Sequence, residues 1–230
     1  IRNIGIAAGG TVMEDCRVIE AVRDGKYTSV LVSTHDKQYI EYRTEHFVNA
    51  LGSGAGKLCD SMGIDAGLYP VRHQAFITRR LPMLGKNGAN LDMLIDRQDY
   101  KGFSAVYGQQ IAYTGQIIGC ASPKLDAMRI DKNLKLNTKA FLEIVSEMFV
   151  EWIPDLAGVG IQAVWAGYYT EPRYIVDPEL GLFVGMRGHG FMLSQYIAKM
   201  YVDKLMGRPV PEYFDKLKLN GPGLSEKAFK

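Results

Sequence analysis

The chain has 230 residues, of which 47% are hydrophobic and 23% charged, a composition typical of a globular protein with a buried core. Its 27 basic and 25 acidic residues leave a formal net charge of +2, so it lacks the basic excess of proteins that bind nucleic acid. No apolar run approaches the roughly 18 residues that a membrane-spanning helix needs, and we expect no membrane span.

Cysteine and histidine are sparse. Cys16, Cys59 and Cys120 are odd in number and far apart, which argues against a disulfide framework or a zinc site. The four histidines form no pair at metal-ligand spacing on a helix, so no bound metal is expected. Residues 1–10 do not have the pattern of a signal peptide. We therefore expect a cytoplasmic protein, with peripheral attachment to a membrane as the alternative.

The first third of the chain is rich in β-type patterns. Residues 11–22 and 27–33 flank an Asp24-Gly25 turn, which predicts a hairpin. A third run, residues 39–50, ends in a short apolar strand and is followed by the small-residue stretch 51–56 and a short helix. A strand, a glycine turn and a helix in this order let the backbone approach a ligand closely and direct the helix amino terminus toward negative charge.

The middle of the chain combines short strands with the most regular helix. Four β-type runs separated by Gly, Pro and Asn predict an antiparallel sheet: residues 74–78, 91–96, 104–109 and 116–121. The helix carries apolar side chains at helical spacing up to Trp152, is capped by Asn137 or Thr138, and ends before Pro154.

In the last part of the chain, two further β-type runs precede a long helix. The runs are residues 160–169 and 182–186, and Gly188-His189-Gly190 opens the helix, which ends near residue 206. We expect the residues after Pro209 to be irregular. The elements predict an α+β fold with a domain division that is discontinuous in sequence. We predict an α/β part formed by residues 1–70 and 161–230 and an antiparallel sheet with its helix in residues 71–160.

Several segments resemble those of a known family. Residues 165–169, 182–187 and 188–194 have the order and spacing of the carboxy-terminal signature of the D-amino-acid oxidase superfamily, especially its sarcosine oxidase, glycine oxidase and dimethylglycine dehydrogenase-like members. Residues 47–56 resemble the family's Asn-Ala-x-Gly-Ala segment, and residues 70–74 resemble the strand that follows it. The resemblance covers nearly the whole chain and implies a FAD-dependent oxidoreductase.

One part of the family's pattern is absent. The Gly-x-Gly-x-x-Gly turn that opens the family's dinucleotide-binding fold does not occur, and residues 5–10 approach it with the wrong spacing. Residues 1–5 also resemble the end of a helix and contain no initiating Met. We expect an incomplete FAD/NAD(P)-binding fold, completed by an upstream segment or by a second chain.

The resemblance assigns residues 1–70 and 161–230 to FAD binding and residues 71–160 to substrate binding. The residues that it implies for FAD are Val18, Ala50, Gly52, Gly188, His189, Gly190, Phe191 and Met192. Independently, a Gly-x-Gly that enters a helix leaves backbone N–H groups directed at one spot, which favours partial negative charge. In the family this spot holds the pyrimidine edge of the flavin. The alternative is that Gly188 and Gly190 only permit a tight turn.

Substrate binding requires other side chains. An amino-acid carboxylate needs a cation, and arginine suits it because its guanidinium pairs bidentately. Arg72, Arg173 and Arg187 are candidates, with Arg187 the first choice. Tyr168 and Tyr169 lie where the resembling family turns from its substrate sheet toward the flavin, so we expect one phenol to line the pocket and the other to pack. The alternative is that both are amphipathic tyrosines of the sheet. The predicted substrate-binding residues are Arg187, Tyr168, Tyr107 and Gln109. No catalytic residue is identified, and a proton-accepting role of His189 is a minor alternative.

The resemblance implies oxidation of an amine or amino acid at a C–N bond by hydride transfer to flavin N5. Some family members tether FAD through a cysteine before the final flavin loop, but residues 165–177 contain none, which predicts noncovalent FAD. The expected partner is a small-molecule amine or amino acid. Two alternatives stay open: a noncatalytic subunit or isolated domain that needs a missing dinucleotide-binding segment, and a FAD-dependent 2-hydroxy-acid dehydrogenase.

Overall fold

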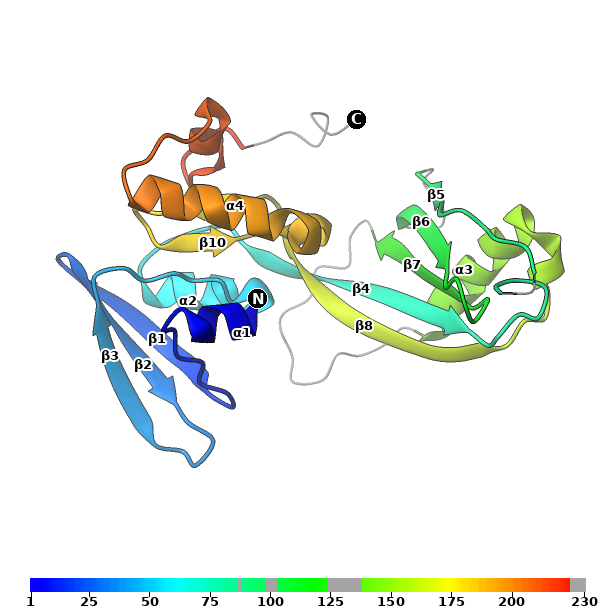
Figure 1. The fold of residues 1–230 in the computed structure, drawn as a ribbon, viewed down its shortest axis with the longest axis horizontal. Coiled ribbons are helices and arrows are strands. Elements are labelled where there is room, and N and C mark those ends of the chain that lie inside the picture. Colours follow the sequence, from blue (N-terminus) through cyan, green and yellow to red (C-terminus); the bar gives the residue numbers. More distant parts are fainter. Residues whose placement is uncertain (87, 98–102, 124–137, 224–230) are drawn as a thin grey trace. The chain divides into compact units, whose positions relative to one another are not determined.

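The computed structural model describes all residues except 87, 98–102, 124–137 and 224–230 (Figure 1). The fold is α+β, as the sequence predicts, and it consists of two compact units. Unit 1 comprises residues 1–68 and 172–230, and unit 2 comprises residues 69–171. The second boundary differs from the predicted division after residue 160, because strand β8 (Ile161–Glu171) pairs with β4 (Tyr69–Thr78) along its whole length.

Unit 1 begins with the short helix α1 (Arg2–Ala7) and a three-stranded antiparallel sheet. Its strands are β1 (Arg17–Asp24), β2 (Tyr27–Ser33) and β3 (Tyr39–Thr44), and the first two form the predicted hairpin. Gly25 has a φ of 60° at the hairpin turn, a backbone conformation that glycine adopts without steric cost. One face of the sheet packs on helix α2 (Ala55–Ser61), where Ala21, Val30 and Leu58 share a core cluster.

The second half of unit 1 contains a two-stranded sheet and the final helix. Strands β9 (Ile175–Asp177) and β10 (Leu182–Val184) are antiparallel, and α4 (Gly190–Leu205) follows. The expectation of an irregular tail is wrong for residues 212–217, which form the 3-10 helix η4 (Glu212–Leu217). Two of its apolar side chains, Phe214 and Leu217, are buried in a cluster with Met200 and Tyr201.

Unit 2 is built on a five-stranded antiparallel sheet with the strand order β5-β6-β7-β4-β8. Its remaining strands are β5 (Leu94–Asp96), β6 (Phe103–Gln110) and β7 (Ile117–Pro123). Helix α3 (Thr138–Trp152) ends before the 3-10 helix η2 (Pro154–Leu156), as the position of Pro154 predicts. The alternative cap Asn137 lies outside the described residues. Among these residues, each helix is too short or too polar to traverse a bilayer.

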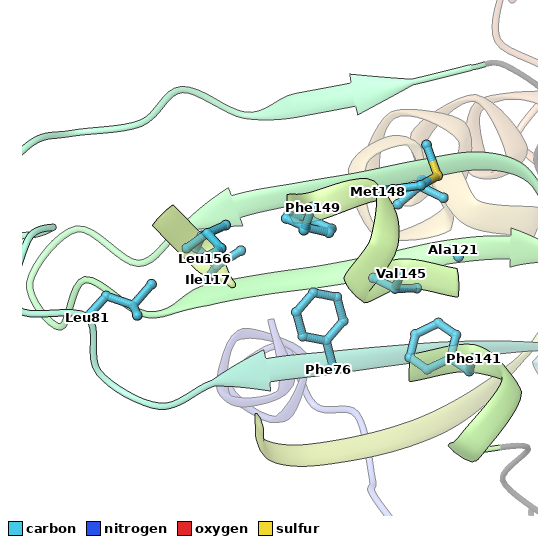
Figure 2. Packing of buried hydrophobic residues seen from close by; sticks show 10 residues of the cluster. Phe76, Leu81, Ile117, Ala121, Phe141, Val145, Met148, Phe149 and Leu156 are labelled. Atoms are coloured by element: carbon cyan, nitrogen blue, oxygen red, sulfur yellow. The ribbon is translucent and has the colours of Figure 1, made fainter. Parts of the chain in front are cut away.

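Helix α3 covers one face of this sheet, and Figure 2 shows the core between them. The rings of Phe76 on β4 and Phe149 on α3 meet edge to face with centroids 5.3 Å apart. Two glycines make room for these rings. A Cβ at Gly108 would lie 2.3 Å from Phe149 Cζ, and a Cβ at Gly119 would lie 2.4 Å from Phe76 Cε1. Glycine at these positions therefore leaves room for the two rings, and α3 covers only this face of the sheet.

Candidate functional site

The predicted glycine-rich turn lies in unit 1 and is fixed by one buried side chain. Asn49 forms a single parallel bridge with Leu182, so the predicted strand at residues 47–50 is reduced to this residue. Its amide side chain donates to the Ala55 carbonyl at 3.0 Å and accepts from the Leu51 N–H at 3.3 Å. Because Asn49 also exchanges backbone hydrogen bonds with Gly181 and Phe183, the turn that carries Ala50 and Gly52 is held beside β10.

The loop between β10 and α4 has little steric freedom. Gly185 has a φ of 70°, and a Cβ there would lie 1.9 Å from the Arg173 carbonyl oxygen. A Cβ at Gly190 would lie 2.7 Å from Met186 Cβ. Arg187, in the 3-10 helix η3 (Arg187–His189), has a φ of 48°, which is uncommon for a residue with a side chain. The backbone path of this loop is therefore set by glycines and by one strained residue.

The loop ends at the amino terminus of α4. The cap residue His189 makes no side-chain cap hydrogen bond, and the backbone N–H groups of the first turn have no acceptor within the helix. Gly190, Phe191 and Met192 form this turn, and the Phe191 side chain is 99% exposed. The end of α4 thus presents oriented N–H groups and the positive end of the helix dipole.

The side chain of His189 points to the core of unit 1. Its Nδ1 lies 2.7 Å from the hydroxyl of Tyr174, which is buried. This contact holds the ring in place and supports the interpretation that His189 contributes mainly through its backbone. The other alternative, a proton acceptor, stays untested.

The three candidate arginines differ in position. Arg173 donates to the carbonyls of Gly221 and Leu219, which anchors the turn after η4. Arg72 pairs with Tyr168 across β4 and β8 in unit 2, and Arg187 is half-buried in the loop before α4. Only Arg187 therefore lies in the predicted flavin loop, and its role as a carboxylate ligand stays a prediction.

A pocket of about 290 Å³ lies in unit 2. It is lined by His73, Gln74, Ala75, Met93, Tyr107, Gln109, Ile118, Gly119, Cys120, Trp165, Gly167 and Tyr169. The alternation of side chains along the strands and their register place most of these on the face opposite α3. The sequence-predicted Tyr107 and Gln109 are together in this pocket.

Tyr168 does not share this face. It follows Gly167 directly on β8, so its side chain points to the opposite side of the sheet, and Tyr169 is the phenol that lines the pocket. The Tyr168 hydroxyl is buried and has no hydrogen-bond partner within the described part of the chain. The correction follows from the two-residue period of a strand, since a shift by one residue moves a side chain to the other face.

The polar groups of the pocket contact one another. The Tyr169 ring stacks on His73 with centroids 3.8 Å apart and planes at 25°. Tyr107 forms a side-chain hydrogen bond with Tyr169 and contacts Cys120, its partner across β6 and β7. Burial, assisted by the Cys120 and Tyr169 neighbours, raises the pKa of Tyr107, and burial also raises the pKa of Cys120 and Tyr169. All three groups are therefore neutral at physiological pH.

Comparison with known proteins decides the family. The model of a family described as FAD dependent oxidoreductase matches residues 3–204. The chain belongs to this family. A search of curated proteins found no match.

Solved structures of several oxidoreductases have a similar fold. L-proline dehydrogenase from P. horikoshii is 24% identical with a TM-score of 0.71, and the match covers 93% of this chain and 55% of the dehydrogenase chain. Glycine oxidase from Geobacillus kaustophilus is 18% identical with a TM-score of 0.67, over 94% and 54%. Iminodiacetate oxidase from Chelativorans sp. BNC1 is 15% identical with a TM-score of 0.67, over 96% and 57%. The chain thus spans about half the length of these relatives.

The residues of unit 1 suit the flavin of this family. The N–H groups at the start of α4 match the acceptor atoms at the pyrimidine edge of an isoalloxazine ring, and the turn at residues 49–55 is held open beside β10 by Asn49. Val18 is half-buried on β1 opposite Val32 and packs against the core of the hairpin. Its side chain is used for packing, so only its backbone is left for the predicted contact with FAD.

Sequence reasoning missed several pocket residues. His73, Cys120 and Trp165 lie at alternate positions of β4, β7 and β8, and the period of two could have grouped each with its neighbours on the same strand. The pairing of Cys120 with both Ala75 and Tyr107 depends on the register of distant strands. That register is not readable from one sequence.

Proposed function

We propose that the chain is part of an enzyme that oxidises an amine or amino acid at a C–N bond with FAD as hydride acceptor. The observation that carries the proposal is the pocket with the hydrogen-bonded pair Tyr107 and Tyr169 beside the stacked ring of His73. The described residues that line it include no Lys, Arg, Asp or Glu. Such a pocket favours a neutral amine, the form that can give up a hydride from its α-carbon.

When bound, FAD supplies a hydride acceptor at N5 of its ring. We propose that the backbone of residues 188–192 holds the pyrimidine edge and that Ala50 and Gly52 contact the cofactor. The cofactor is proposed to be noncovalent, because residues 165–177, which precede the predicted flavin loop, contain no cysteine. Precipitation with acid should leave the yellow colour in the supernatant. Colour that stays with the polypeptide would contradict this part of the proposal.

The pocket residues bind and orient the substrate. The neutral phenols of Tyr107 and Tyr169 can each donate or accept a hydrogen bond. The stack on His73 holds the ring of Tyr169 in position. Separately, in unit 1, we propose Arg187 as a carboxylate-binding residue, because the fork of its guanidinium pairs with both oxygens. No strong base is needed if the amine enters unprotonated.

A substrate panel tests the reaction class. Purified protein loaded with FAD is mixed without oxygen with sarcosine, glycine, L-proline, D-amino acids and a 2-hydroxy acid such as 2-hydroxyglutarate. We expect at least one amine to bleach the visible absorbance of the flavin and the hydroxy acid to leave it unchanged. Bleaching by the hydroxy acid alone would overturn the proposal.

A further inference from the structure

Among the described residues, neither backbone conformation nor crowding explains why residue 167 is glycine. It lies inside β8, and its φ is not among the left-handed values recorded for other glycines of the described chain. A Cβ built on Gly167 meets no atom of the described residues within 4 Å, in contrast to the crowded Gly108 and Gly119 of the same sheet. Glycine inside a strand lowers stability, and it often marks a place where a ligand approaches the backbone.

The neighbours of Gly167 form a slot above it. Trp165 and Tyr169 lie two residues before and after it on the same face, and all three line the pocket. The Cα atoms of the two aromatic residues are about 13 Å apart at the usual rise of a strand. Trp165 is 42% exposed although its side chain belongs to the pocket.

The Tyr169 ring is held by residues of neighbouring strands. Its ring stacks on His73, a diagonal neighbour on β4, and its hydroxyl is hydrogen-bonded to Tyr107 on β6. These two contacts hold the phenol over the middle of the sheet. The open space at Gly167 therefore lies between Trp165 and Tyr169 on β8 and beside His73, the partner of Gly167 on β4.

We propose that Gly167 determines substrate specificity by admitting an apolar substituent of the amine, of the size of a five- or six-membered ring, between Trp165 and Tyr169. Flat and aliphatic rings suit this slot because aromatic side chains flank it and residue 167 adds no side chain of its own. This inference rests on the proposed function for the amine, but the slot itself is a property of unit 2.

A graded series of variants tests the slot. In Gly167→Ala and Gly167→Val, we expect the dissociation constants of L-proline and phenylalanine to rise progressively, by about tenfold or more for Val, since one methylene in an apolar pocket is worth about that much. The constant for sarcosine should change by less than about twofold. Binding is measured by calorimetry and by the fluorescence of Trp165, which Trp165→Phe distinguishes from that of Trp152.

Two further measurements separate the outcomes. Ala163→Val adds bulk on the same strand and face outside the lining residues, and it should leave all three constants unchanged. The melting temperature of Gly167→Ala should equal or exceed that of the wild type. Equal binding of phenylalanine by wild type and Gly167→Val, or no binding of the large amines by wild type, would overturn the inference. Size-dependent binding without turnover of any amine would instead overturn the proposed function and leave the inference standing.

Discussion

The loop before α4 and the pocket face of the unit 2 sheet represent two ways of building a site. In the loop, the geometry is set by the backbone: Gly185 has a left-handed φ, and a Cβ there would lie 1.9 Å from a carbonyl oxygen. On the pocket face, glycine leaves space, as at Gly167, and the polar chemistry belongs to the side chains of Tyr107, Tyr169 and His73. The first kind of site should fail when any side chain is added, and the second when a particular functional group is removed.

The largest effect is expected in the loop. Gly185→Ala combines a left-handed φ with a backbone clash, so we expect the free energy of unfolding to fall by about 2–5 kcal/mol and FAD binding to be lost. Gly25→Ala is the matched control, because Gly25 has a similar φ of 60° with open space around it. Strain alone should cost about 1–2 kcal/mol there. Urea unfolding followed by circular dichroism measures both, and equal losses would show that the Arg173 carbonyl does not constrain the loop.

A smaller effect is expected from the two adjacent tyrosines of β8, Tyr168 and Tyr169. Tyr169→Phe removes the hydrogen bond with Tyr107, and we expect the Kd of the bound amine to rise about five- to tenfold, or about 1 kcal/mol. Tyr168→Phe removes a buried hydroxyl without a described partner, so stability should stay the same or rise by about 1 kcal/mol while binding is unchanged. The reverse result, with weakened binding in Tyr168→Phe only, would restore the sequence prediction of Tyr168.

This pair of residues illustrates how far sequence reasoning reached. The glycine turn, the hairpin, the helix that ends at Pro154 and the loop before α4 follow from local signals, and all are present. Tyr107 and Gln109 are two residues apart, so predicting a strand at residues 104–109 was enough to place both side chains on the same face. The choice between Tyr168 and Tyr169 needs the absolute phase of β8. That phase is set by the pairing of Phe76 with Val164 under α3, a contact between segments almost ninety residues apart.

The helix η4 shows the same limit in unit 1. Residues 212–217 contain only two large apolar side chains that become buried, too few for a helical period to be evident. Their burial depends on the cluster formed with Met200 and Tyr201 of α4. The local sequence pattern therefore predicted turns, the hairpin and the long helices, whose signals lie within one segment. It missed a short element whose burial depends on residues of another helix.

The smallest expected effect concerns pH and distinguishes the pocket face from an ordinary polar surface. Burial raises the pKa of Cys120 and Tyr107, so the folded state favours their neutral forms. This stability is fully present below the ordinary values of about 8.5 for a thiol and about 10 for a phenol, and it is lost as pH rises toward the raised pKa. The free energy of unfolding should therefore be flat between pH 7 and 8 and fall above pH 8.5.

Removing the thiol isolates its share of this decline. In Cys120→Ala, the free energy of unfolding should fall less steeply above pH 8.5 than in the wild type, by at most about 1.4 kcal/mol per pH unit for one group. Cys16→Ala, at a half-buried position in unit 1, is the matched control for loss of a thiol. Parallel curves for wild type and Cys120→Ala would mean that the Cys120 thiol is as well solvated in the folded chain as in the unfolded one. The pocket face would then be wetter than the burial of Cys120 against Tyr107 implies, and the neutral hydrogen-bonded pair proposed to orient the amine would lose its physical basis.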